Sequence, residues 1–363
     1  MTKAIKTMKK HNKTKKHNKT RKRQNKNPSN QKVKIQNTTK VNIHRLPYYH
    51  HPTIGILSIP MTASYQKNTH SYIPASYVKW IQMNNARVVP IPYDTPIGSI
   101  KMILNQINGM LFIGGQVDHG MISQEYVRFM QTFKEIVNFA KKENNNGRHF
   151  PIFSICLGME ILAMMSLDHN EIIKGFLTRK IISNVDAHKM NTTLDFKGSQ
   201  NNNTIFSSQE IDEFRKNDCV FMNHGQGYII SNPYIKKIYN KYWSTIATSK
   251  DKKGEEYVSF FKFNKYPFYG CQFHPEKILF EWLLPEIGRT YLYRKISHKL
   301  SYFFVNEARK SKKQFKMPDL DIKNYNLWSR SDTISKIKPN RKLFKKNNSS
   351  FENSYYFDII SNS

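Results

Sequence analysis

The residues of this sequence best suited to covalent chemistry lie around Cys156. The preceding stretch 150–155 is apolar, as in a buried strand, and Gly158 follows the cysteine where a helix would begin. Strand, nucleophile and helix in this order form a nucleophile elbow, whose sharp turn lifts the side chain out of the sheet. Small residues at 154 and 158 allow close backbone approach. We therefore predict that Cys156 is a nucleophile rather than a core cysteine, and that the helix N-terminus lowers its thiol pKa.

A second group of residues could supply the base for this nucleophile. In the stretch 270–276 an expected strand ends at His274, and Glu276 follows two residues later. Residues i and i+2 of an extended segment point the same way, so Glu276 can orient the imidazole and stabilise its charged form. The other ring nitrogen would then face the thiol. This is the nucleophile, base and orienter arrangement of a catalytic triad.

A third group could bind the oxyanion that forms when sulfur attacks a carbonyl carbon. Gly114 and Gly115 follow an apolar run and precede Gln116-Val117-Asp118. The backbone N–H groups of this pair and of Leu157 would be the donors. Losing one such donor typically costs about 2.7–4 kcal/mol of barrier stabilisation. Because glycine pairs also occur in simple turns, this pair indicates a site only together with the other two groups.

The elements that must position these residues follow from the alternation of apolar runs and amphipathic stretches. We expect strands at 53–59, 87–91, 110–113 and 150–155, and helices at 75–84, 97–107 and 123–142. Strands that alternate with helices at this spacing predict βαβ units and a parallel sheet. Sites in such sheets form at the carboxyl ends of strands, where the glycine pair and the cysteine fall.

The second half of the chain is expected to be richer in strands. Candidate strands between residues 171 and 270 are 220–222, 228–230, 244–248 and 257–263. An apolar stripe predicts one long helix over 285–313. The remainder, 314–363, is irregular with scattered aromatic residues, and we expect it to pack on the domain as a C-terminal extension.

Charge is distributed very unevenly along the chain. The whole sequence of 363 residues carries a net charge of +32, yet residues 1–50 contain 16 Lys and Arg and no Asp or Glu. A segment of that composition cannot bury enough apolar surface to offset the entropy lost on ordering. We predict a disordered basic extension at 1–50 and a folded domain at 51–313. Nucleic acid is not an expected partner, except through that basic tract.

Several classes of protein are disfavoured by composition. The three cysteines do not suggest a disulfide framework. No run of 18 apolar residues occurs, so no membrane span is expected. Residues 1–50 also lack the apolar stretch of a secretory signal. A cytoplasmic or nuclear location is therefore favoured, and a homodimer is one assembly the chain could form.

Together these motifs resemble the class I glutamine-amidotransferase-like superfamily and, within it, the γ-glutamyl hydrolases of peptidase family C26. Glutamine amidotransferases usually carry Gln two residues after the elbow glycine, whereas this chain has Glu160, as γ-glutamyl hydrolases do. Further segments that resemble those hydrolases are Ala75-Ser76-Tyr77-Val78-Lys79, Ala86-Arg87-Val88-Val89-Pro90, Gly114-Gly115-Gln116-Val117-Asp118, Gln272-Phe273-His274-Pro275-Glu276-Lys277, 303–310 and 347–358.

The resemblance implies a fold, an activity and a set of site residues. The fold would be a flavodoxin-like three-layer α/β sandwich with a mostly parallel central sheet. The activity would be hydrolysis of γ-glutamyl bonds in folate or antifolate poly-γ-glutamates through a thioester, without a metal or cofactor. Cys156 would be the nucleophile, His274 the general base and acid, and Glu276 the orienter. Glu160 and His224 would lie in the substrate pocket.

The sequence departs from the family pattern in places, and two other functions stay open. Ser154 replaces the usual first glycine of the elbow, and Phe273 replaces a more common tryptophan. A basic tract stands where family members usually carry a signal peptide. One alternative is a glutaminase of the glutamine amidotransferase type, which Glu160 disfavours. The other is a non-enzymatic basic binding protein, which the intact Cys, His and Glu disfavour.

Overall fold

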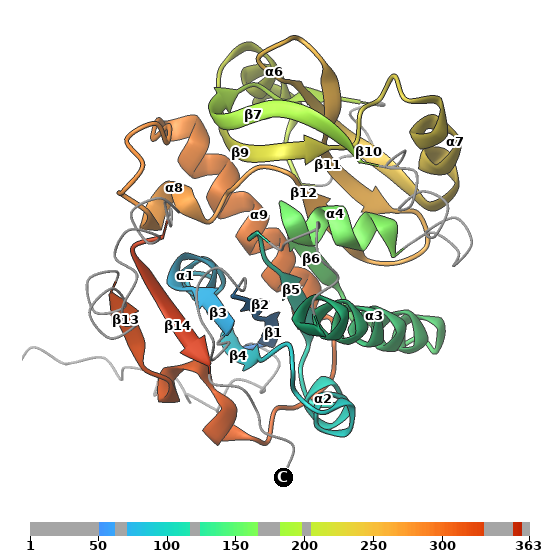
Figure 1. Ribbon diagram of the computed structural model, residues 1–363, viewed down its shortest axis with the longest axis vertical. Helices are drawn as coiled ribbons and strands as arrows, with labels where there is room; N and C mark the ends of the chain where they lie inside the picture. Colours follow the sequence, from blue (N-terminus) through green and yellow to red (C-terminus); the bar gives the residue numbers. More distant parts are fainter. Residues whose placement is uncertain are drawn as a thin grey trace, which may run out of the picture. The chain divides into compact units, whose positions relative to one another are not determined.

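A large central sheet organises the part of the chain that the computed structural model describes, which is residues 51–61, 71–116, 124–165, 182–197, 205–329 and 351–357 (Figure 1). The order of its strands is β4 (Arg87–Ile91), β1 (Thr53–Leu57), β5 (Gly109–Phe112), β6 (Ile152–Ile155), β12 (Phe268–Cys271), β11 (Glu256–Phe263), β10 (Trp243–Lys250) and β8 (Asp195–Phe196). The strands from β4 to β12 are parallel, and the last three continue the sheet in antiparallel fashion. This confirms the predicted mostly parallel sheet. The basic tract 1–50 lies outside the described residues.

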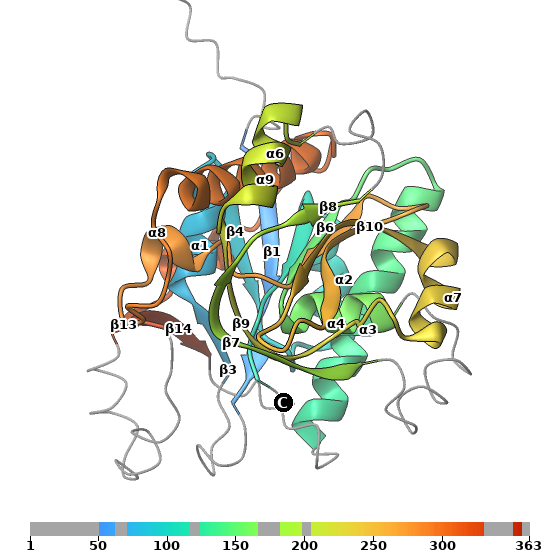
Figure 2. The same ribbon diagram turned by 90° about the horizontal axis from the view of Figure 1, so that it is seen from above.

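Helices cover both faces of this sheet (Figures 1 and 2). The helices α1 (Ala75–Gln82) and α9 (Tyr291–Arg309) lie on one face, and α2 (Ile97–Leu104), α3 (Gln124–Asn145) and α4 (Leu157–Met164) on the other. On the first face the ring of Phe153 packs 5.6 Å from Trp80 and 5.5 Å from Phe304. On the second face Phe112 stacks on Phe133 with ring centroids 3.7 Å apart. The three-layer α/β sandwich is therefore confirmed.

Because both faces are covered, the parallel strands read as continuous apolar runs rather than alternating ones. Every residue of β1, β5 and β6 is buried. The predicted strand 53–59 divides, since β1 ends at Leu57 and Ile59 begins a short strand, β2 (Ile59–Pro60). In a second sheet of order β13-β14-β3-β2, that strand pairs with β3 (Ser71–Pro74), which pairs in turn with β14 (Asn353–Phe357) and β13 (Leu327–Ser329).

The region between 171 and 270 is less uniformly stranded than predicted. A two-stranded sheet forms from β7 (Ser183–Thr192) and β9 (Val220–Gly227), but α6 (Ser208–Lys216) and α7 (Pro233–Tyr242) are helices. A capping box between Ser207 and Glu210 starts α6, a local signal that outweighs its low apolar content. The expected strand at 228–230 is wrong, because only Ile229 bridges to Tyr257.

The predicted helix 285–313 begins six residues later than expected. Residues 281–290 form an irregular connection between α8 (Lys277–Phe280) and α9, which starts after Thr290. Gly288 packs so closely on Tyr293 that a Cβ there would lie 2.1 Å from a ring carbon. After α9 the chain forms two short 3-10 turns, Pro318–Leu320 and Ile322–Asn324.

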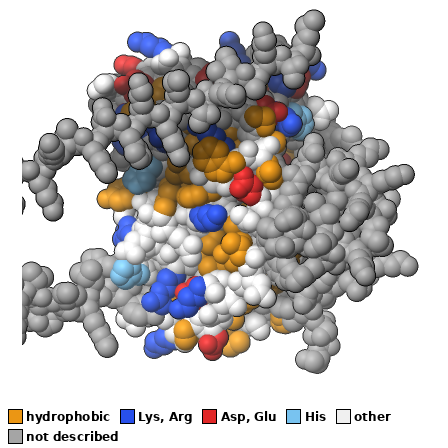
Figure 3. Space-filling model, turned by 90° about the vertical axis from the view of Figure 1, so that its left-hand side faces the viewer, with side chains coloured by type: hydrophobic (Ala, Val, Ile, Leu, Met, Phe, Trp, Pro, Cys, Tyr) orange, Lys and Arg blue, Asp and Glu red, His pale blue; other side chains and the backbone are white. Residues whose placement is uncertain are grey.

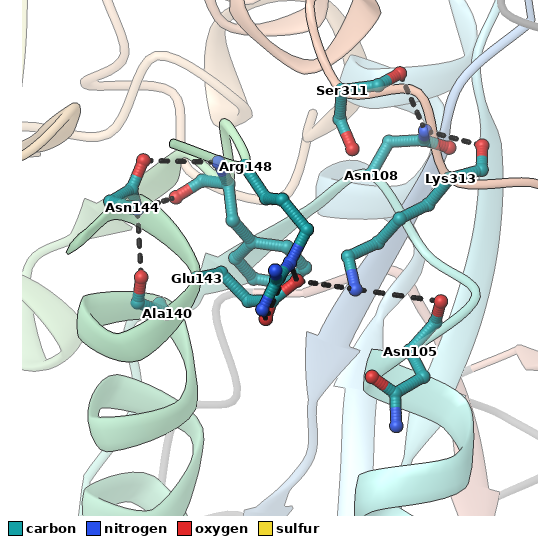
Figure 4. Close-up of polar contacts among 9 residues, drawn as sticks. Asn105, Asn108, Ala140, Glu143, Asn144, Arg148, Ser311 and Lys313 are labelled. Atoms are coloured by element: carbon teal, nitrogen blue, oxygen red, sulfur yellow. Dashed lines mark hydrogen bonds and ion pairs between the residues drawn. The ribbon is translucent and has the colours of Figure 1, made fainter. Parts of the chain in front are cut away.

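The segment after α9 is attached to the amino ends of the parallel strands (Figure 4). The buried side chain of Asn108 accepts a hydrogen bond of 2.8 Å from the Thr53 N–H and donates one of 2.9 Å to the Lys313 carbonyl. Nearby, the buried Glu143 carboxylate lies 2.7 Å from Arg148 and 2.8 Å from the Lys313 ammonium. These contacts lie at the edge of the sheet opposite the carboxyl ends of the strands.

Candidate active site

The predicted nucleophile elbow is present at Cys156. The residue stands between the end of β6 and the first residue of α4, with φ 51° and ψ −115°. A positive φ in a residue other than glycine costs of order 1–3 kcal/mol and persists only where the surrounding structure enforces it. Gly158 permits this tight turn, because a Cβ there would lie 2.6 Å from the Phe112 carbonyl oxygen. The thiol is thus held at the carboxyl edge of the sheet by two neighbouring strands.

His274 and Glu276 form the predicted pair after β12. The ring atom Nδ1 of His274 lies 2.8 Å from Glu276 Oε1, and both side chains are buried. The His274 N–H also donates to the Phe221 carbonyl at 3.0 Å, which fixes the backbone beside β9. Within the described residues His274 Nε2 makes no hydrogen bond. The pair is therefore arranged with Nδ1–H donating to the carboxylate and Nε2 available to accept a proton.

Gly114 is the point at which these groups meet. A Cβ on Gly114 would lie 3.1 Å from Cys156 Cβ, 3.1 Å from His274 Cε1 and 2.7 Å from Tyr77 Oη. The end of β5, the elbow after β6 and the segment after β12 therefore converge around one glycine. No larger residue fits there without displacing the nucleophile or the base. The structure thus brings together three groups that lie up to 160 positions apart in the sequence.

The predicted oxyanion donors do not have equal hydrogen-bonding environments. The Gly114 N–H already donates to Tyr77 Oη at 3.0 Å. Gly115 faces a different neighbour, since its Cβ position lies 3.1 Å from the Ile59 side chain. The Leu157 N–H lies at the Cys156 thiol, whose ionised form it favours. The Gly114 N–H is thus already engaged, and the oxyanion role of Gly115 and Leu157 stays a prediction.

The expectation of a lowered thiol pKa is wrong. Burial raises the pKa of Cys156, and the charges of Glu160 and Glu276 raise it further. The Leu157 N–H and the Lys277 ammonium oppose that rise but do not reverse it. The helix N-terminus was expected to dominate, yet desolvation of the thiolate is the larger effect here. The resting nucleophile is a neutral thiol.

The protonation state of His274 suits a neutral thiol at Cys156. Burial lowers the pKa of His274, although the charge and the hydrogen bond of Glu276 act in the opposite direction. The imidazole is therefore neutral at physiological pH and can take the thiol proton when sulfur attacks. A neutral thiol beside a neutral imidazole is the starting state that this geometry supports.

Glu160 lies beneath the nucleophile, on the first turn of α4. Its Oε1 accepts a hydrogen bond of 2.7 Å from Gln272 Nε2, and Tyr228 donates to its backbone carbonyl. Burial raises the pKa of Glu160 to about 7, against the opposing effect of the Gln272 amide. Since the carboxyl group titrates near neutrality, it can carry or lose a proton close to the thiol.

His224 lies on β9, close enough to His274 for their charges to interact. Its Nδ1–H donates to the Gln226 carbonyl at 2.7 Å, and its ring meets Tyr257 edge-on at 5.2 Å. Burial lowers the pKa of His224 to about 3. The ring is thus a neutral acceptor through Nε2, which has no partner among the described residues.

Sequence reasoning assigned no role to Tyr77 or Lys277, although both lie within family-like segments. Tyr77 is fully buried, accepts the Gly114 N–H and interacts with the charge of Glu276. Lys277 is buried beside Glu276 and interacts with the Cys156 thiol. The signal for Tyr77 was its place at the start of α1, directly after β3, where it faces inward.

The described residues were also compared with the requirements of a metal site and of a membrane-spanning helix. Among the residues that the structure describes, no cluster of three or more His, Cys, Asp or Glu side chains could hold a metal ion. In the same ranges, none of the helices combines the length and the apolar character needed to cross a bilayer.

Comparison with known proteins gives a consistent family. The sequence model of the family described as Peptidase C26 matches residues 52–276. The chain is 31% identical to gamma-glutamyl hydrolase B of Dictyostelium discoideum over 283 residues, which is 76% of this chain and 78% of that protein. It is 31% identical to gamma-glutamyl hydrolase 1 of Arabidopsis thaliana, over 72% of each chain. Gamma-glutamyl hydrolase of Homo sapiens is 30% identical, over 85% of this chain and 90% of that protein.

The matched segment contains the elbow, the glycine pair and the base with its carboxylate, which are the groups that converge around Gly114. Family match, sequence identity over most of both chains and site geometry agree. The chain belongs to the peptidase C26 family of γ-glutamyl hydrolases.

Proposed function

We propose that this protein hydrolyses γ-glutamyl bonds of folate poly-γ-glutamates through a thioester on Cys156. The observation that carries the proposal is the convergence of Cys156 and His274 at Gly114: Cys156 Cβ and His274 Cε1 each lie 3.1 Å from the position that a Cβ on Gly114 would take. The relatives named gamma-glutamyl hydrolase support the type of bond that is cleaved. The folate substrate and the thioester are the proposed refinements.

The first half of the reaction forms the thioester. His274 Nε2 takes the proton of the Cys156 thiol as Sγ bonds to the γ-carbonyl carbon of the substrate. The oxygen of the tetrahedral intermediate is stabilised by the N–H groups of Leu157 and Gly115, donors preorganised where negative charge develops. The C–N bond then breaks, and the His274 imidazolium gives its proton to the departing amine.

The second half releases the acyl group. His274, neutral again, removes a proton from water as the water oxygen attacks the thioester carbon. The C–S bond breaks, and the proton returns to sulfur to regenerate the resting thiol. Throughout the cycle Glu276 accepts Nδ1–H of His274 at 2.8 Å, which keeps Nε2 directed at the reacting atoms and stabilises the imidazolium.

A product analysis with folate pentaglutamate tests this function. Mass spectrometry should show shortened folates and released glutamate or glutamate peptides with the wild-type chain. Cys156→Ala should abolish the release while the protein remains folded. Cys219→Ala is the matched control, because Cys219 is a buried thiol that donates to the Phe214 carbonyl instead of facing the base. Undiminished turnover by Cys156→Ala would rule out the assignment.

The same assay separates the competing glutaminase activity. Free glutamine presented at equal concentration should release little ammonia compared with the hydrolysis of the pentaglutamate. An acid-quenched reaction of the wild-type chain should also contain a Cys156 peptide carrying the folate-linked acyl group. The absence of that adduct under burst conditions would contradict the thioester step.

A further inference from the structure

The C-terminal strand brings residues from the end of the chain to the catalytic motif. β14 pairs with β3, with Ser354 opposite Pro74 and Tyr355 opposite Ile73. This pairing places Phe351 and Glu352, just before β14, against the segment that follows Glu276. These residues lie outside the stretch matched by the family model. On the side of the molecule that carries α8 and β14, hydrophobic side chains and charges of both signs are interspersed (Figure 3).

Phe351 contacts both residues that adjoin the triad. The Lys277 ammonium lies 4.0 Å from the centroid of the Phe351 ring. On the other side, the rings of Phe351 and Tyr77 are 6.1 Å apart. Tyr77 accepts the Gly114 N–H, so one aromatic ring connects the C-terminus to the glycine turn as well as to Lys277.

Glu352 attaches the same segment to the residues after α8. Its N–H donates to Glu281 Oε2 at 2.7 Å, and its Oε1 accepts the Trp282 N–H at 2.5 Å. Two hydrogen bonds in opposite directions fix the path of the backbone there. Phe351 is therefore held at one position over Lys277 rather than resting loosely on the surface.

Lys277 is a buried ammonium, and such a charge requires compensation inside a protein. Its exposed fraction is 1%, so burial lowers its pKa, whereas the charges of Glu276, Glu281 and Cys156 act to raise that pKa. The ring face of Phe351 adds a cation–π contact, which is stronger when the cation is desolvated. The ammonium therefore lies against the Phe351 ring, and the charges of Glu276, Glu281 and Cys156 act on it.

We propose that Lys277 is a positioning residue for the reaction and that Phe351 holds its ammonium beside Cys156. When sulfur loses its proton, negative charge appears next to Glu160 and Glu276, which both disfavour it. The Lys277 ammonium offsets that charge. The C-terminal segment is thereby part of the catalytic apparatus. This inference rests on the proposed nucleophilic role of Cys156.

The experiment measures how fast Cys156 of the full-length chain reacts with iodoacetamide as a function of pH. Peptide mass spectrometry follows Cys156 separately from the buried Cys219 and Cys271. Lys277→Met should slow alkylation about 10-fold at pH 7.5, equivalent to a thiol pKa higher by about one unit. It should lower kcat for the pentaglutamate with little change in KM. Lys277→Arg should retain most of the wild-type rate.

Phe351 is tested with paired variants. Phe351→Leu keeps an apolar side chain but lacks the aromatic face, so alkylation should slow by about 3-fold, a fraction of the cation–π contribution. Phe351→Tyr should restore the wild-type rate. Phe357→Leu is the matched control, since Phe357 is a buried residue of β14, the strand that follows Phe351, and its ring packs on Tyr325 at 5.4 Å. It should alter melting temperature but not the alkylation profile.

Some outcomes would overturn the inference. A folded Lys277→Met variant whose alkylation has the wild-type pH dependence would overturn it. If Lys277→Met fails to fold, equal alkylation rates for Phe351→Leu and Phe351→Tyr would overturn it instead. Because alkylation needs no substrate, a chain that shows the Lys277 effect but leaves the pentaglutamate intact would refute the proposed function and retain the inference.

Discussion

The backbone N–H of Gly114 donates a hydrogen bond of 3.0 Å to the phenol oxygen of Tyr77. This contact joins the turn after β5 to the first turn of α1. Since Tyr77 also interacts with Glu276, the glycine turn and the orienting carboxylate share one buried side chain. The position of Gly114 beside Cys156 and His274 therefore depends on a residue of α1 as well as on β5.

Substitution of Gly114 should strongly reduce kcat while the fold is retained. In Gly114→Ala the new methyl group would lie 3.1 Å from Cys156 Cβ and from His274 Cε1, and 2.7 Å from Tyr77 Oη. We expect kcat to fall at least about 100-fold, because misplacement by roughly 1 Å costs that much. Steady-state kinetics with a γ-glutamyl substrate measures the loss.

Gly98→Ala is the control for that substitution. Gly98 is on α2 and has no atom within 4 Å of its Cβ position, so alanine there should leave kcat unchanged. Helix propensity should raise stability by about 0.5–1 kcal/mol. Equal activities of the two alanine variants would show that the contacts around Gly114 do not matter for turnover.

Glu276→Gln should change both the rate and its pH dependence. Glu276 raises the pKa of His274, while burial lowers it. Loss of the carboxylate therefore lowers that pKa further, and the acid limb of the kcat/KM profile should move to lower pH. The plateau should fall by roughly 100- to 10,000-fold, because the imidazolium is no longer stabilised or oriented. Profiles recorded from pH 4 to 9 give both quantities.

The partly exposed carboxylate Glu286 provides the comparison for that profile. It pairs with the Lys189 ammonium at 3.3 Å instead of with a histidine. Glu286→Gln should leave the limb and the plateau in place. An acid limb that does not move in Glu276→Gln would refute the assignment of that limb to His274.

Glu160→Gln should remove a specific dependence of stability on pH. The pKa of Glu160 in the folded chain is about 7, above its usual value of 4.5, because burial disfavours the carboxylate. A raised folded-state pKa gives stability that is complete below about pH 4.5 and lost as pH rises through 7. Over that window the unfolding free energy of the wild type should decrease by about 3 kcal/mol relative to Glu160→Gln. Urea titrations at pH 4.5, 6 and 8 measure the difference, and a constant difference across them would argue against a buried neutral Glu160.

Asn108→Ala should destabilise the protein without impairing catalysis. The change leaves the buried Thr53 N–H without its acceptor. It also leaves the Ser311 and Lys313 carbonyls without the amide donor that Figure 4 shows. An unsatisfied buried group costs about 1–3 kcal/mol, measured as the free energy of unfolding. Asn105→Ala serves as control, since the Asn105 side chain is exposed and its backbone carbonyl, not its amide, receives Lys313. A comparable loss in both variants, or a fall in kcat in the first, would contradict this role for Asn108.

Much of the parallel half of the fold was readable from the sequence, because strands buried on both faces give continuous apolar runs. β4 and β5 lie within one residue of their predicted bounds. The elements of the β-rich half were harder to predict from the sequence. α6 is polar and short, and its start depends on a capping box between Ser207 and Glu210 that apolar periodicity does not register. α9 starts after Thr290, and Gly288 in the preceding connection packs on Tyr293, a contact that the apolar stripe does not register.

By itself the sequence determined the chemical groups and their approximate place. An elbow cysteine, a histidine with a carboxylate two residues on, and a glycine pair after a strand are local patterns, and local patterns are set by residue types and spacing. The tertiary structure decided the protonation states and the partners. Burial of Cys156 outweighs the helix N-terminus and leaves a neutral thiol, because desolvation depends on everything packed around the sulfur. Tyr77 accepts a hydrogen bond from Gly114, and Phe351 packs on Lys277. Both contacts likewise join residues from separate elements, and no spacing along the chain specifies them.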